Sequence, residues 1–97
     1  MKKEVIILPK AETSLQPILD YLLEEWSISV HNDFLDDVAK ITEQISEHPK
    51  SFPVSKKNQI RRAIINKHIV LFYLEKNDVI EVLLFWNMSK NPRKLKL

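Results

Sequence analysis

Four basic side chains near the middle of the chain are the residues best suited to chemistry: Lys56, Lys57, Arg61 and Arg62. Their positive charges can bind a phosphate group. His68 follows a predicted turn, and no carboxylate stands at a spacing that would orient it as a base. The same cations can bind the carboxylates of an acidic protein. These residues therefore predict an anion-binding surface.

The other histidines and the missing residue types argue against a metal or a cofactor. His31 and His48 flank a predicted helix, and their separation does not match that of metal ligands. The sequence has no cysteine, which excludes disulfides and thiolate metal sites and fits a cytoplasmic protein. It also has no glycine, which excludes a glycine-rich phosphate loop. We therefore expect no metal and no cofactor.

Charge is strongly separated along the chain, although the net charge is only +2. Residues 12–47 hold nine acidic residues and one basic residue, a net charge of −8. Residues 48–97 hold eleven basic and three acidic residues, a net charge of +8. Part of this positive charge lies in a basic tail at about residues 89–97. The separation is compatible with a charged partner and with attraction between the two halves of one fold.

The length of 97 residues predicts one domain, spanning residues 1–97, with a modest core. No apolar run approaches the roughly 20 residues that a membrane helix needs, so we expect no membrane partner. The apolar stretch near the start is also shorter than the roughly 7–15 residues of a signal peptide.

Apolar spacing predicts a short strand at residues 3–8 and two amphipathic helices. The first helix is expected at about residues 13–26 with Ser14 as its N-cap, and the second at about residues 30–47. If the first helix began earlier, Pro17 would lie deeper inside it and should kink it.

Three apolar runs between residues 58 and 92 predict an antiparallel meander with two tight hairpins, because Asn and Asp tolerate the left-handed backbone of such turns. Strict alternation along the last strand would give it two sides, Ile80, Val82, Leu84 and Trp86 on one and Glu81, Leu83, Phe85 and Asn87 on the other. Both sheet faces are then largely apolar, and a helix pair can cover only one of them. The uncovered face predicts a protein partner, a homodimer or a tail that folds back over it.

The expected element order is therefore β-α-α-β-β-β. This is an α+β domain in which an N-terminal strand and a helix hairpin pack on a mostly antiparallel sheet.

Several segments resemble the RelE/ParE toxin superfamily. They are the helix stripe that ends in Trp26, HPKSFP at 48–53, IRRAII at 60–65, KHIVLFY at 67–73 and NMSKNP at 87–92. The resemblance covers essentially the whole chain in the right order and is closer to ParE, the toxins of plasmid-stabilisation modules. It implies the β-α-α-β-β-β fold and a cognate antitoxin that wraps the toxin through a disordered segment. The implied target is DNA gyrase for the ParE type, or the mRNA on the translating ribosome for the RelE type.

The resemblance also implies where a nuclease would keep its catalytic residues. RelE-type cleavage depends on a basic cluster over the sheet, often with a C-terminal tyrosine. When the chain is aligned on Tyr73, these positions hold Arg61, Ala63, Val70 and approximately Met88, and no tyrosine follows Tyr73. Because only one basic residue is kept, the comparison disfavours a nuclease.

Our main hypothesis is therefore a type II toxin that acts by binding, with gyrase as its target. One alternative is a RelE-type ribosome-dependent mRNA endoribonuclease that uses Arg61 with Lys56 or Lys57. Another is a decayed, non-toxic scaffold that still binds an antitoxin. The residues expected to bind the antitoxin or the target are Arg61, Arg62, Phe85, Asn87, Lys90, Arg93 and Lys94.

Overall fold

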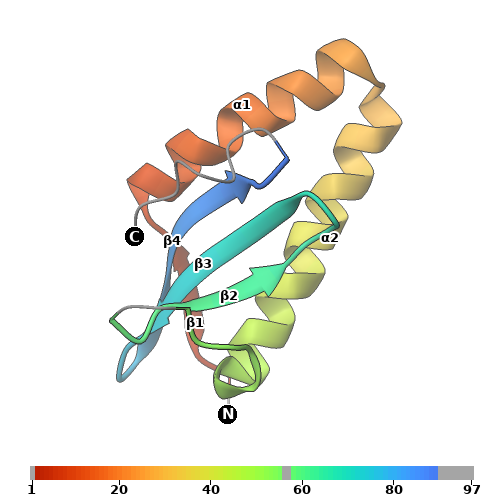
Figure 1. The fold of residues 1–97 in the computed structure, drawn as a ribbon. Coiled ribbons are helices and arrows are strands. Elements are labelled where there is room, and N and C mark those ends of the chain that lie inside the picture. The colour runs from red at the N-terminus through yellow and green to blue at the C-terminus, as the bar shows by residue number, and fades with distance from the viewer. Residues whose placement is uncertain (1, 56–57, 90–97) are drawn as a thin grey trace.

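The computed structural model describes residues 2–55 and 58–89 and shows two helices packed on a four-stranded sheet (Figure 1). The elements are β1 (Glu4–Ile7), α1 (Pro9–Glu25), α2 (Ile28–Glu47), a short 3-10 turn η1 (Pro49–Ser51), β2 (Arg61–Ile64), β3 (Ile69–Glu75) and β4 (Val79–Asn87). The predicted β-α-α-β-β-β order and α+β class are confirmed. The strands lie in the order β1-β4-β3-β2, with β1 parallel to β4 and the other pairs antiparallel.

The first helix begins earlier than its apolar stripe predicts. It starts at Pro9, directly after the extended residue Leu8, because proline fits the first turn of a helix, where its missing N–H has no intrahelical partner. The prediction that Ser14 caps this helix is therefore wrong, and Pro17 lies inside the helix. The second helix is capped by Ser27, whose side chain accepts a hydrogen bond of 3.1 Å from the backbone N–H of Val30.

The meander has the two predicted hairpins, but neither turn has the predicted left-handed backbone. Among the described residues, only Asn58 and Gln59 have positive φ angles, and they lie before β2. At the first hairpin the Asn66 side chain instead accepts hydrogen bonds from the backbone N–H groups of His68 (2.8 Å) and Ile69 (3.0 Å). Asparagine therefore makes this turn through its side chain rather than through a left-handed backbone.

A β-bulge in β4 overturns the predicted alternation of its side chains. Tyr73 lies opposite Val82 while the preceding residue of β3, Phe72, lies opposite Leu84, so Leu83 is an extra residue in β4. The bulge exchanges the two faces for everything that follows it. Phe85 therefore joins Val82 on the helix side and is 1% exposed.

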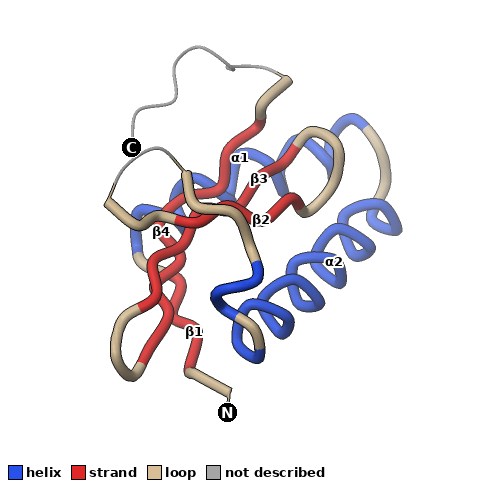
Figure 2. The backbone as a smooth tube through the Cα atoms, turned by 60° about the horizontal axis from the view of Figure 1, so that its bottom comes forward, coloured by secondary structure: helices blue, strands red, loops and turns tan. Residues whose placement is uncertain are grey.

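The helices cover the sheet face that carries the core. Figure 2 shows both helices on one side of the strands. The core cluster consists of Ala11, Phe34, Val38, Ile45, Ala63, Ile69, Leu71, Tyr73, Ile80, Val82 and Phe85. At the end of the core that lies next to η1, the hydroxyl of Tyr73 donates a hydrogen bond of 2.6 Å to the Pro49 carbonyl, and the Tyr73 ring packs edge-on against Phe52. This contact fixes the irregular segment after α2 against the sheet.

The opposite face is apolar, as predicted, but it is not uniformly open. It carries Val70, Phe72, Leu74, Leu84 and Trp86. Phe72 is only 3% exposed, whereas Ile64 on the edge strand β2 is 64% exposed. The accessible apolar surface of this face therefore lies at its β2 edge rather than at its centre.

None of the helices in the described part of the chain is both long and apolar enough to cross a membrane.

Candidate functional site: a groove between the helix hairpin and the sheet

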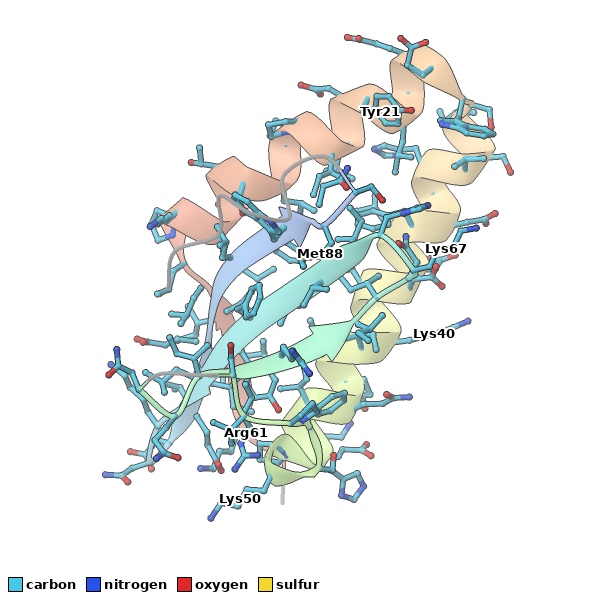
Figure 3. All side chains as sticks on the ribbon, in the orientation of Figure 1. Tyr21, Lys40, Lys50, Arg61, Lys67 and Met88 are labelled. Carbon is cyan, nitrogen blue, oxygen red and sulfur yellow. The ribbon has the colours of Figure 1, made fainter. Side chains whose placement is uncertain are left out.

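A groove of about 770 Å³ lies between the helix hairpin and one end of the sheet. Figure 1 shows the α1–α2 turn projecting beyond the ends of the strands. In Figure 3, Tyr21 on α1 lies on one side of this region, and Lys67 and Met88 lie at the facing end of the sheet. The apolar lining consists of Pro17, Ile18, Tyr21, Leu22, Trp26, Val30, Phe34, Ile69, Leu84, Phe85 and Trp86.

The unequal lengths of β1 and β4 create this groove. β1 pairs only with Val79–Val82 of β4, so the rest of β4 has no neighbouring strand on that side. The chain turns into α1 at this point, where the backbone N–H of Leu8 donates to the Val82 carbonyl (3.1 Å). Further along, the Ser14 hydroxyl accepts a hydrogen bond of 2.9 Å from the backbone N–H of Phe85. The helix thus replaces the missing strand and leaves the groove beyond it.

The groove has an exposed aromatic and aliphatic end at the tip of the hairpin. Trp26 is 66% exposed and Ile28 is 69% exposed, although both are large apolar side chains. Tyr21 and Val30, which line the groove, are 40% and 36% exposed. Trp26 stands at the C-cap of α1, outside the helical stripe that faces the core. A continuous exposed apolar surface of this kind usually marks an interaction site.

The rim of the groove is polar and differs between its two sides. Asp33 and Asp37 line it from α2. On the sheet side it is lined by Asn66, His68, Asn87 and Ser89. His68 Nδ1 contacts the Ser89 hydroxyl, and the Asn87 side chain accepts a hydrogen bond of 3.0 Å from the Ser89 N–H.

Within residues 2–55 and 58–89, no ion pair joins the two charged halves of the chain. The ion pairs among the described residues are those of Lys2 with Glu43 and Glu47, Lys3 with Glu75, and Lys76 with Glu81. None of them connects an acidic residue of 12–47 with a basic residue of 48–97. Among the described residues, no direct ion pair therefore joins the acidic and the basic halves.

Arg61, the leading catalytic candidate, is engaged by the fold. Its guanidinium donates to the carbonyls of Phe52 (2.6 Å) and Lys50 (3.4 Å), and it lies on the helix side of the sheet, opposite Tyr73. The hydrogen bond from Lys3 lowers the pKa of the nearby Glu75 carboxyl, and the charges of Lys50 and Arg61 add to that effect. Burial raises the pKa of the Tyr73 hydroxyl to about 12. These interactions describe a structural network rather than a site arranged around a reacting phosphate.

The other predicted site residues lie in different places. Arg62 is exposed on the face opposite the helices, and Asn87 lines the groove. The bulge in β4 turns Phe85 to the helix side, where it is 1% exposed and lines the groove, and its role in binding stays a prediction. Several predicted residues lie outside the described residues, namely Lys56, Lys57, Lys90, Arg93 and Lys94.

Sequence reasoning did not identify the groove. The helical residues that line it follow the apolar periodicity that also predicts a buried core face. Its polar rim combines α2 with two sheet segments that are far apart in sequence, one around Asn66 and His68 and one around Asn87 and Ser89. The available signal was Trp26, a large aromatic side chain placed after the last residue of a helix. No group of three or more His, Cys, Asp or Glu side chains among the described residues is arranged to hold a metal ion.

Comparisons with known proteins agree with the architecture. A model of the family described as "ParE toxin of type II toxin-antitoxin system, parDE" matches residues 5–92. A chain from the chromosomal ParDE system of P. aeruginosa has a similar fold, with a TM-score of 0.72 at 13% identity, over 89% of this chain and 96% of that one. A copper-bound mutant toxin from Helicobacter pylori gives a TM-score of 0.59 at 16% identity, over 92% of this chain and 98% of that one. No curated protein sequence gives a significant match. The family match spans nearly the whole chain, and the chain therefore belongs to the ParE toxin family of type II toxin–antitoxin systems.

Proposed function

We propose that this toxin is neutralised by a cognate antitoxin that fills the groove between the helix hairpin and the sheet. The observation that carries the proposal is the groove itself, with its volume of about 770 Å³ and its exposed apolar end at Trp26 and Val30. An isolated soluble protein gains nothing from leaving such side chains in water, since each buried aliphatic or aromatic side chain contributes about 1.5–3 kcal/mol. A partner segment with apolar side chains would recover that free energy.

We further propose that the free toxin acts on DNA gyrase by binding, without a covalent step of its own. The family supports a toxin, and the engagement of Arg61 by backbone carbonyls supports a function other than phosphate chemistry at that residue. Arg62, exposed on the other sheet face, is the described residue best placed for contact with an acidic surface.

Antitoxin binding is tested by expressing the chain with and without the product of a small acidic reading frame that adjoins its gene. Expression alone should arrest growth, and co-expression should restore growth and yield a complex of the two proteins. The groove is tested with Val30→Asp, which places a charge among its apolar lining, and this variant should lose capture by the antitoxin. Leu35→Asp is the matched control, because Leu35 is 38% exposed on the same helix, Val30 is 36% exposed, and only Val30 lines the groove.

Equal antitoxin capture by the two folded variants would remove the groove from the proposal.

The target is tested by DNA supercoiling with purified gyrase. Inhibition at micromolar toxin is expected, and the antitoxin should relieve it. Unchanged supercoiling, together with cleavage of mRNA in ribosome toeprints that is lost in Arg61→Ala, would replace this target with the RelE-type alternative. Growth without arrest would point to the decayed scaffold.

A further inference from the structure

The acidic side of the groove constrains what can enter it. Asp33 and Asp37 are one helical turn apart on α2, so their carboxylates project along the same side of the groove. Asp33 is exposed and Asp37 is half-buried. Neither makes an ion pair with any of the residues that the structure describes. Like charges at this spacing destabilise a helix.

No described lysine or arginine lines the facing side of the groove. Lys67 lies at that end of the sheet in Figure 3, but it does not line the groove and makes no ion pair with Asp33 or Asp37. The groove residues there are Asn66, His68, Asn87 and Ser89, three neutral polar side chains and one histidine. His68 Nδ1 is already in contact with the Ser89 hydroxyl. On α2 itself the basic residue Lys40 does not line the groove, and Figure 3 shows it pointing away from the sheet. The groove therefore combines an apolar floor with two carboxylates on one wall that make no ion pair with any described residue.

We propose that the groove takes an amphipathic antitoxin segment whose apolar residues are flanked by lysine or arginine, with the cation placed against Asp33 and Asp37. This inference rests on the proposed function and adds the charge of the partner to it. An acidic residue at the same place on the segment would face two like charges and would be rejected. The groove thus selects its partner by repulsion as well as by attraction. Opposite charges at this wall would also speed the encounter of the two proteins.

The experiment uses the full chain and two synthetic helical peptides of about four turns. The peptides share one leucine face and contain no aromatic residue, and they differ only in two flanking positions, which are lysine in one peptide and glutamate in the other. Trp26 and Trp86 are the two tryptophans of the chain and both line the groove, so tryptophan fluorescence reports occupancy directly. At low salt the lysine peptide should bind about fivefold to tenfold more tightly than the glutamate peptide, as two partly exposed ion pairs allow. The preference should shrink at about 1 M salt, where the screening length is about 3 Å.

Charge-neutral variants decide whether the groove carboxylates cause the preference. The double variant Asp33→Asn/Asp37→Asn should bind the two peptides equally. Asp36→Asn is the matched control, because Asp36 is exposed on the same helix and does not line the groove, and it should keep the preference. An equal loss in both variants would show a general effect of net charge and would overturn the inference.

Other outcomes would assign the groove elsewhere. If neither peptide changes the fluorescence, or if both bind equally to the native chain, the inference is wrong even when an antitoxin still neutralises the toxin. A fluorescence change on dilution of the protein alone, matched by a dimer in sedimentation, would assign the groove to a second copy and overturn the proposal. A change in tryptophan fluorescence on removal of residues 90–97 would assign the groove to the chain's own tail and would also overturn the proposal. Failure of antitoxin capture in the cell, by contrast, would overturn the proposed function and leave the peptide preference standing.

Discussion

Replacement of Ser14 by alanine tests how α1 is joined to the unpaired half of β4. The Ser14 hydroxyl accepts the Phe85 N–H at 2.9 Å and donates to the Ala11 carbonyl at 2.7 Å. Phe85 is 1% exposed, so the variant leaves its N–H without a partner in a nearly dry environment. Such a loss costs about 1–3 kcal/mol. Alanine returns about 0.5 kcal/mol through its higher helix propensity. We therefore expect Ser14→Ala to lower the free energy of unfolding by about 1.5 kcal/mol.

Two measurements check this value. Thermal unfolding followed by circular dichroism should show a decrease in Tm of about 6–12 °C, since 1 kcal/mol corresponds to about 4–8 °C in a domain of this size. Amide hydrogen exchange should show faster exchange at the Phe85 N–H. The matched control is Thr13→Ala, which removes the hydroxyl of an exposed neighbour and should leave both measurements nearly unchanged. Ser14→Thr retains the hydroxyl and should recover part of the loss. If Ser14→Ala unfolds like the Thr13 control and the Phe85 N–H remains protected, α1 is not fixed to β4 in this way.

Three further predictions concern the network at the other end of the sheet. Tyr73→Phe should lower the free energy of unfolding by about 1 kcal/mol in urea titrations, because the partly buried Pro49 carbonyl loses its donor. Since the pKa of the Tyr73 hydroxyl is raised to about 12, its stabilising effect should be complete below pH 10 and be lost between about pH 10 and 12, a decline that is absent in the phenylalanine variant. Glu75→Gln should destabilise the fold at neutral pH, because the hydrogen bond from Lys3 stabilises the charged carboxylate and lowers the pKa of Glu75. This stabilisation is lost as the pH falls through the lowered pKa, so the difference in stability between the variant and the native chain should vanish in acid. Arg61→Ala should lower the Tm, because two backbone carbonyls lose their donor. Arg62→Ala should leave the Tm unchanged and weaken partner binding. The reverse result in melting and binding assays would make Arg62 the structural residue and Arg61 the binding residue.

The sequence predicted the element order because each element has a local signal. The 3.6-residue periodicity of the two helices, the proline after β1 and the asparagine-containing turns are read over a few residues, and all of them appear in the structure. The family resemblance followed from motifs spread in the same order along the chain, and the family match confirms it. The predicted alternation of side chains along β4 is correct only up to Val82. An extra residue in one strand has no local signature when both faces are apolar, so the bulge and the burial of Phe85 could not be read from alternation.

The sequence by itself therefore determined the fold class, the superfamily and the separation of charge between the two halves of the chain. Only the tertiary structure decided where the accessible apolar surface lies and which charges remain without a partner. Both depend on the length of β1 relative to β4, which sets where α1 leaves the sheet and opens the groove. They also depend on contacts between residues far apart in sequence, such as the hydrogen bonds that hold Arg61 against the segment after α2. Periodicity describes which side of its own element a residue occupies, but a groove between elements exists only after they have packed.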